Sequence, residues 1–104
     1  MNDKLNQAIN QLINNIHKDY HKNINYFSGG LDIKLKPGRK FIKIIEDRSV
    51  WGFVAKVDGT HKGLPMKEGD VFKAASWSQA AKHTRGNVFA DKQDYFTWSG
   101  PNYL

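Results

Sequence analysis

Apolar side chains recur every three or four residues in the first part of the chain. They are Leu5, Ala8, Ile9, Leu12, Ile13, Ile16 and Tyr20. This spacing gathers them on one side of a helix, so it predicts an amphipathic helix from about residue 3 to about residue 21. The side-chain oxygen of Asn2 or Asp3 can accept a hydrogen bond from a free backbone N–H at the helix start. We expect the apolar stripe to be buried, either on the protein's own sheet or in a homodimer, because each exposed leucine or isoleucine would forgo about 1.5–3 kcal/mol.

The period changes to two from residue 31. The segment LDIKLK at 31–36 alternates apolar with charged residues, which is typical of a half-buried strand. KPGR then supplies a turn. The segments KFIKIIE at 40–46 and SVWGFVAKV at 49–57 are rich in β-branched and aromatic residues, as strands are. The EDR between them reads as a tight connection, so these segments predict a three-stranded meander.

The second half of the chain gives weaker signals. DGTHKGLPMKEGD at 58–70 contains three glycines and a proline, which predicts a long polar loop. VFKAASW at 71–77 and YFTWS at 95–99 predict two further strands, whereas the pattern at 78–94 indicates no element. One helix followed by five or six strands predicts an α+β fold, in which the N-terminal amphipathic helix accompanies a small twisted antiparallel β-sheet or open barrel.

The length and composition limit how this fold is organised. Gly29 and Gly30 predict a hinge, so we expect residues 1–28 to form the helix and linker and residues 29–104 to form the β-rich domain. A chain of 104 residues buries one modest core, so both parts should belong to a single compact domain. The chain has no cysteine, which excludes disulfides and thiolate metal sites. No segment approaches the roughly 20 apolar residues of a membrane span, and no signal peptide opens the chain, so we expect a cytoplasmic protein with no membrane partner.

Charge is concentrated in the middle of the chain. The protein has 16 basic and 10 acidic residues and a formal net charge of +6. Five cations follow one another there with no acid among them: Lys34, Lys36, Arg39, Lys40 and Lys43. Such a run favours binding of a polyanion. The alternative is a solvated strand whose lysines keep the sheet edge from pairing.

A second candidate region is KAASWSQAAKHTRGN at 73–87. It adds four candidate contacts, which are Lys73, Trp77, Lys82 and Arg85. Together with the basic run these residues predict a nucleic-acid surface, on which aromatic side chains stack on bases while cations meet phosphates. The aromatic candidates are Trp51, Phe53, Trp77 and Trp98. The alternatives are that the tryptophans belong to the core and that the segment is an ordinary turn between strands.

The sequence offers one pair of residues with metal-ligand spacing. His17 and His21 lie four residues apart, the separation at which two imidazoles on a helix share a metal. However, Lys18 stands where a zinc hydrolase has its glutamate base, and both histidines fall off the apolar stripe. We therefore expect neither a metal nor another cofactor.

Catalytic spacing is equally sparse. None of the serines stands in a nucleophile elbow of the G-x-S-x-G kind, and GTHKG lacks the spacing of a phosphate-binding P-loop. The best remaining group joins His83 and Arg85 to an acid such as Asp70 or Asp91. That group keeps a small hydrolase or nuclease as an alternative, although we expect the protein not to be an enzyme.

Four segments resemble a group of small phage-encoded proteins of uncharacterised function. They are RSVWGFVAKVDG, KEGDVFKAASW, RGNVF and the closing WSGPNYL. The resemblance covers about residues 48–104 and leaves the helix outside it. It implies a viral or prophage origin, and hence the host cytoplasm, but it carries no functional residues. Two interpretations follow: an accessory protein that binds nucleic acid through its sheet, or an interaction module that binds and inhibits a host protein.

Overall fold

A computed structural model of the chain describes residues 3–23, 32–46, 49–91, 93, 95–97 and 100–101. The predicted helix is confirmed as α1 (Asp3–Asn23), which has Asp3 in its first turn. The described residues after it form nine strands: β1 (Ile33–Pro37), β2 (Phe41–Glu46), β3 (Ser49–Ala55), β4 (Gly59–His61), β5 (Leu64–Met66), β6 (Asp70–Ala74), β7 (Ala80–Asn87), β8 (Phe96–Thr97) and β9 (Gly100–Pro101). Asn2, the glycine hinge and Trp98 lie outside the described residues.

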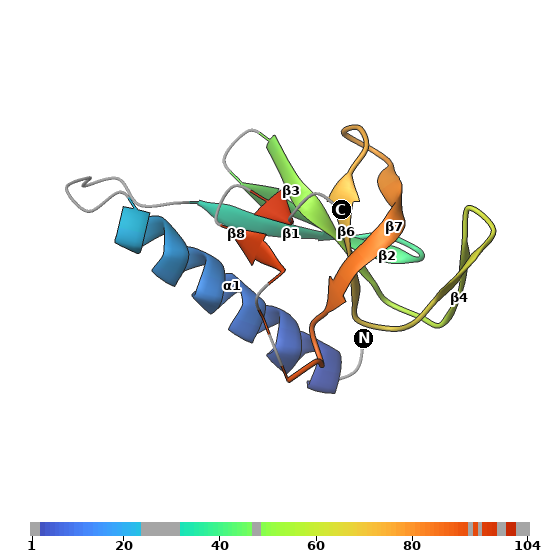
Figure 1. The fold of residues 1–104 in the computed structure, drawn as a ribbon, viewed down its shortest axis with the longest axis horizontal. Coiled ribbons are helices and arrows are strands. Elements are labelled where there is room, and N and C mark those ends of the chain that lie inside the picture. The colour runs from blue at the N-terminus through green and yellow to red at the C-terminus, as the bar shows by residue number, and fades with distance from the viewer. Residues whose placement is uncertain are drawn as a thin grey trace.

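The strands form one five-stranded antiparallel sheet and two small hairpins. The sheet order is β1-β2-β3-β6-β7, and the pairs β4–β5 and β8–β9 are separate. The large sheet is therefore a meander with the β4–β5 hairpin inserted between its third and fourth strands (Figure 1). The predicted fold class, α+β with an N-terminal helix and a small antiparallel sheet, is confirmed, and the sheet stays open.

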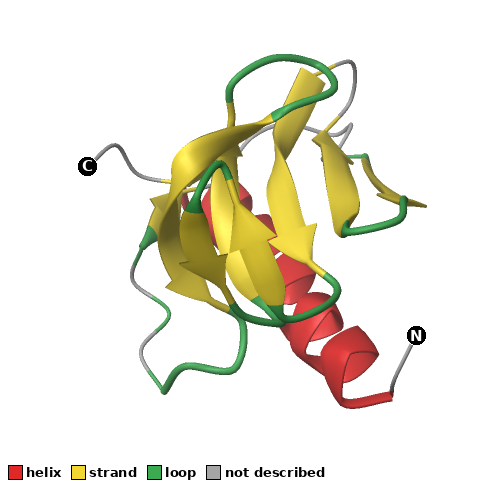
Figure 2. Cartoon of the chain, turned by 90° about the vertical axis from the view of Figure 1, so that its right-hand side faces the viewer, coloured by secondary structure: helices red, strands yellow, loops and turns green. Residues whose placement is uncertain are grey.

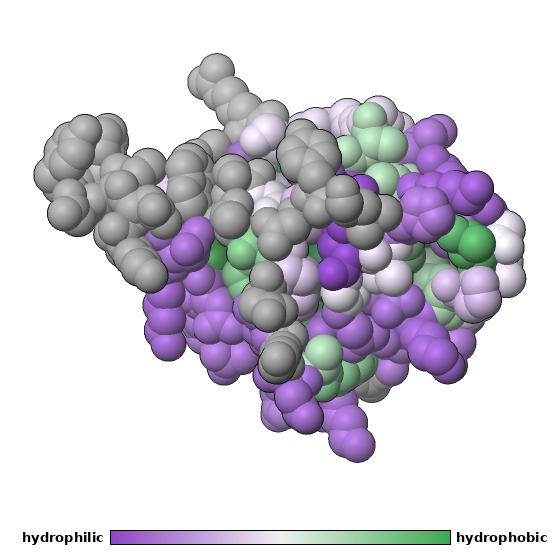
Figure 3. All heavy atoms as spheres, viewed as in Figure 1, coloured by the Kyte–Doolittle hydropathy of each residue, from purple (hydrophilic) through white to green (hydrophobic). Residues whose placement is uncertain are grey.

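Helix α1 lies across one face of this sheet, which we call the helix face (Figures 1 and 2). The stripe residues Leu5, Ile9, Leu12 and Ile16 are at most 1 % exposed. They share a core with sheet residues that include Ile42, Ile44, Trp51, Val54 and Val71. The stripe is thus buried on the protein's own sheet. Burial of the stripe therefore does not require a homodimer. The region of the helix in Figure 3 is mostly hydrophilic, as its polar side predicts.

A second, smaller cluster fills part of the opposite face, which we call the outer face. Its buried residues are Phe53, Ala55, Met66, Phe72 and Ala80. Met66 comes from the β4–β5 hairpin, which also brings the His61 ring to 5.2 Å from the Phe41 ring and 5.0 Å from the Phe72 ring, measured between centroids. The inserted hairpin therefore covers the β6–β7 part of the outer face.

The prediction of a long loop at 58–70 is wrong, because the segment contains β4 and β5. Only Lys62 and Gly63 separate the two strands, and both have positive φ, 50° and 84°. That is the backbone of a tight two-residue hairpin turn. The sequence did not predict this hairpin for two reasons. A Lys-Gly pair indicates such a turn more weakly than Asn-Gly does, and a proline such as Pro65 is uncommon inside strands.

Three further expectations about strands need correction. β6 ends at Ala74, so Trp77 lies in a loop and not on the strand predicted at 71–77. The unassigned block contains β7, an edge strand whose residues lack an apolar and polar alternation. Leu35 is 38 % exposed because β1 is the other edge strand, so β1 is less buried than its alternation predicted.

Among the described residues, no helix combines the length and apolarity needed to cross a membrane.

Candidate functional site

Strand register assigns the basic residues of β1 and β2 to the outer face. Lys36 pairs with Lys43, and Lys43 pairs with Phe53. Paired residues share a face of a sheet, and Phe53 belongs to the outer cluster. Lys34 alternates in step with Lys36, so it lies on this face as well. The helix face of the same strands is apolar because Ile42 and Ile44 point into the core beneath α1.

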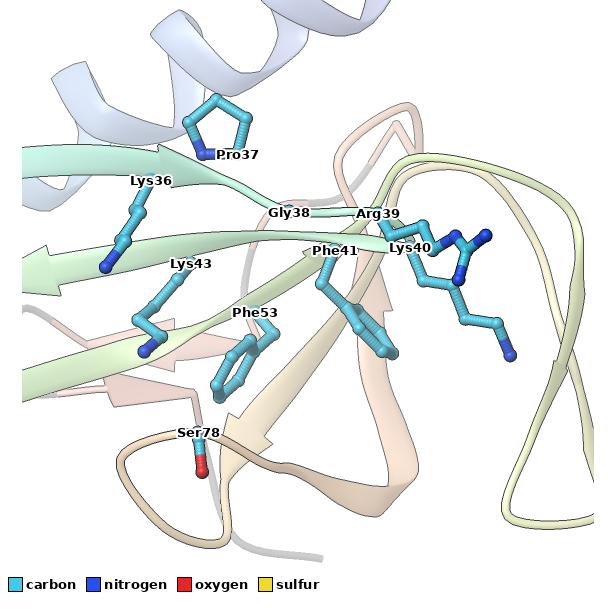
Figure 4. A pocket seen from close by; sticks show the side chains of 9 residues that line it. All are labelled: Lys36, Pro37, Gly38, Arg39, Lys40, Phe41, Lys43, Phe53 and Ser78. Atoms are coloured by element: carbon cyan, nitrogen blue, oxygen red, sulfur yellow. The ribbon is translucent and has the colours of Figure 1, made fainter.

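A hollow of about 260 Å³ opens on the outer face beside the β1–β2 turn, and we call it the lysine pocket. Its nine lining residues are Lys36, Pro37, Gly38, Arg39, Lys40, Phe41, Lys43, Phe53 and Ser78. Figure 4 shows Lys36 and Lys43 extending in the same direction from neighbouring strands, whereas Arg39 and Lys40 reach out from the turn. Phe41 and Phe53 form the apolar part of the lining, with ring centroids 5.9 Å apart.

Trp77 lies beside this pocket, in the loop between β6 and β7. Its side chain is 55 % exposed. The ammonium of Lys43 lies 4.8 Å from the Trp77 ring centroid and 6.0 Å from that of Phe53, within the range of cation–π attraction. Hydrogen bonds from the N–H groups of Ala75 and Ser76 to the carbonyl of Gln79, at 2.9 and 3.2 Å, close the loop. Lys43 thus joins the basic and the aromatic parts of the site.

All four charged residues that line the pocket are basic. No acidic residue is among its nine lining residues. Lys34 lies 3.8 Å from the carboxylate of Asp32, but both side chains are more than 60 % exposed, and such surface pairs attract each other weakly. Lys56 adds a further cation behind the turn, where its ammonium donates to the carbonyl of Gly38 at 2.8 Å.

The structure separates the other predicted contacts from this group. Lys73 alternates with Phe72, so it lies on the helix face, where its ammonium donates to the carbonyl of Pro101 at 3.2 Å. Lys82 is exposed on β7, at the far edge of the sheet. The Arg85 guanidinium donates to the carbonyl of His83 on the same strand. The pocket therefore unites Lys36, Arg39, Lys40 and Lys43, with Lys34 and Trp77 beside it.

Not every predicted stacking residue is accessible. Trp51 is 2 % exposed and Phe53 is 4 % exposed. Trp51 is the extra residue of a β-bulge, because Ile44 pairs with Gly52 while Ile45 pairs with Val50. Trp51 belongs to the core beneath α1 and Phe53 to the outer cluster, so Trp77 is the exposed ring among the stacking candidates that the structure describes. Sequence reasoning missed Phe41 and Ser78; an aromatic residue directly after the KPGRK turn was the signal available for Phe41.

The alternative catalytic group is not assembled. Both carboxylate oxygens of Asp70 accept hydrogen bonds, from the Lys67 N–H at 2.9 Å and from the Asn87 side-chain amide at 3.0 Å. Asp70 also pairs with Asn87 and not with His83. Asp91 is exposed. Within the described residues, no three side chains of the metal-binding types lie together.

These features define a class: a small α+β protein whose open sheet face carries a basic, aromatic-lined groove. The chain belongs to a family of unknown function (DUF7717), whose model matches residues 1–104. The match includes α1, which the sequence resemblance had left outside. Comparisons with curated proteins and with solved structures gave no match.

Proposed function

We propose that this chain is a non-enzymatic, phage-type accessory protein that binds single-stranded nucleic acid at the lysine pocket. The observation that carries the proposal is the contact between Lys43 and the exposed Trp77 ring, at 4.8 Å, beside a pocket lined by four basic and no acidic residues. The phage assignment and a host-cytoplasmic location rest on the sequence resemblance.

The lysine pocket and the neighbouring Trp77 suit a single-stranded nucleic acid with unpaired bases. Lys36, Arg39 and Lys40 carry exposed cationic groups that can meet successive phosphates. The Trp77 ring offers a flat surface on which a base can stack, and stacking tolerates any sequence because every base has a π face. Bases inside a duplex are not available for such stacking, so the arrangement favours a single strand.

Two changes separate the aromatic from the electrostatic contribution. Trp77→Ala should weaken binding of a labelled oligothymidylate by about 1–3 kcal/mol while its salt dependence stays the same, because stacking is uncharged. The double change Lys34→Ala and Lys36→Ala should instead flatten the plot of log affinity against log salt by about 1.4, that is, about 0.7 for each lost phosphate contact. Fluorescence anisotropy at several salt concentrations measures both.

The matched control is Lys4→Ala, which removes an exposed charge from α1, on the other side of the sheet. It should change neither affinity nor slope. If Lys4→Ala weakened binding as much as the pocket changes do, attraction would come from net charge and not from a site. The groove would then be better explained as a surface that contacts a host protein.

A further inference from the structure

A row of register partners crosses the outer face from β1 to β7, and we call it the cross-strand row. Its members, one from each strand of the five-stranded sheet, are Lys36, Lys43, Phe53, Phe72 and Thr84. Each residue is the register partner of the next, so all lie on one face. The row begins in the lysine pocket and ends in a second hollow at the β7 edge.

This second hollow, the histidine pocket, has a volume of about 380 Å³. Its seven lining residues are His61, Leu64, Pro65, Phe72, Lys82, His83 and Thr84, none of which is acidic. The Thr84 hydroxyl lies 2.9 Å from the carbonyl of Gly86 and 3.2 Å from that of Val71, so its proton is committed to the backbone. Lys82 and His83 are both exposed, and they are left to contact a ligand.

Two rings cover the middle of the row and connect the pockets. Phe53 and Phe72 are nearly buried, and above them lie Phe41 and His61, both partly exposed and edge to face at 5.2 Å. His61 Nε2 lies 2.9 Å from the carbonyl of Ala81, so this nitrogen carries a proton and donates it, which ties the hairpin to β7. The surface between the pockets is therefore aromatic, and it is tied to β7 through His61.

We infer that a single strand held in the lysine pocket continues over Phe41 and His61 to the histidine pocket, where Lys82 meets a phosphate. This inference rests on the proposed function and adds the path and length of the bound strand. The row crosses four gaps between strands of about 4.8 Å each, which makes about 19 Å. At the rise of about 3.4 Å per nucleotide along one strand of a DNA helix, that distance corresponds to about six nucleotides.

Binding of oligothymidylates of two lengths tests the path. Lys82→Ala should weaken binding of an oligomer of about ten nucleotides several-fold and flatten its salt slope by about 0.7. The same change should leave an oligomer of about three nucleotides unaffected, because that length fills the lysine pocket without reaching β7. Lys4→Ala is the control for loss of one positive charge.

Two results would overturn the path while leaving the proposed function intact: equal binding of the long oligomer by Lys82→Ala and wild type, or an equal loss at both lengths, each with Trp77→Ala still weakening binding. Absence of wild-type binding at either length would instead remove the proposed function, and the path with it.

Discussion

A glycine stands at position 86 because the Tyr95 ring fills the space that a side chain would need. A Cβ built on Gly86 would lie 2.4 Å from the Tyr95 ring atoms Cγ and Cδ2. Tyr95 belongs to the core beneath α1, and its hydroxyl donates to the side-chain carbonyl of Gln93 at 3.0 Å. The Tyr95 ring therefore packs directly against the backbone of β7 at Gly86.

The contact between Gly86 and Tyr95 can be tested by adding a methyl group. Gly86→Ala should lower the free energy of unfolding by about 1–3 kcal/mol, because the added methyl overpacks a filled site. Gly59→Ala is the matched control, since a Cβ there meets nothing within 4 Å, and it should change stability by less than about 0.5 kcal/mol. Urea unfolding of the two variants measures both. Equal stability of Gly86→Ala and wild type would contradict the packing described.

Tyr95 also makes stability depend on pH. Burial raises the pKa of its phenol above the ordinary value of 10.0. The unfolded protein therefore releases the phenolic proton first, near pH 10, while the folded protein still holds it. Stability contributed by the neutral phenol is complete below that pH and falls as pH rises above it.

Tyr95→Phe tests this pH dependence, because the phenylalanine side chain has no hydroxyl to ionise. Comparing urea unfolding at about pH 8 and about pH 11, wild type should lose more stability than Tyr95→Phe. Lysines titrate in both proteins and cancel in the comparison. Identical losses would show that the phenol is exposed enough to ionise in the folded protein.

Among the helices and strands, those with the strongest periodicity or composition signal were predicted most accurately. The α1 stripe repeats over about four turns, so its position and burial could be predicted. β2 and β3 are dense in β-branched and aromatic residues, and their bounds fall close to the predicted ones. β7 reads AAKHTRGN; an edge strand needs no alternation, since hydrogen bonds to β6 hold it.

The candidate site was predictable in part for the same reason. Alternation along β1 correctly assigned Lys34 and Lys36 to one face, and adjacency along the chain grouped Arg39 and Lys40 with them. The approach of Trp77 to Lys43 depends on β6 ending at Ala74 and on the strand order, neither of which the local sequence specifies. The sequence grouped Lys73 with the other basic candidates, but Lys73 lies on the helix face. Its neighbour Phe72 lies on the outer face, because successive residues of a strand point to opposite faces.

The helix gives the prediction that belongs to this scale. Leu12→Ala should lower the free energy of unfolding by about 2–5 kcal/mol, because the side chain is fully enclosed between α1 and the sheet. Asn10→Ala, at an exposed position of the same helix, should not lower it, since alanine favours helix at least as well as asparagine. Urea unfolding with circular dichroism distinguishes a core helix from a free arm, for which both changes would be neutral.

At the scale of the whole molecule, the two faces of the sheet have different roles. The helix face is covered by α1 and supplies most of the core. The β4–β5 hairpin covers part of the outer face, and another part holds the lysine pocket and Trp77. The strands that carry the cations are packed under α1 on their other face, so the strand register sets the spacing of Lys36 and Lys43.

The most direct test of this account is the salt dependence of single-strand binding by the wild-type protein. Anisotropy of a labelled oligothymidylate of about ten nucleotides, measured between about 50 and 200 mM salt, gives the slope of log affinity against log salt. If about four phosphates meet the cations of the groove, the slope should lie near −3, that is, about −0.7 for each phosphate. Absence of binding even at the lowest salt would contradict the account, favour the host-protein interaction module, and leave the Trp77 loop as a turn between β6 and β7.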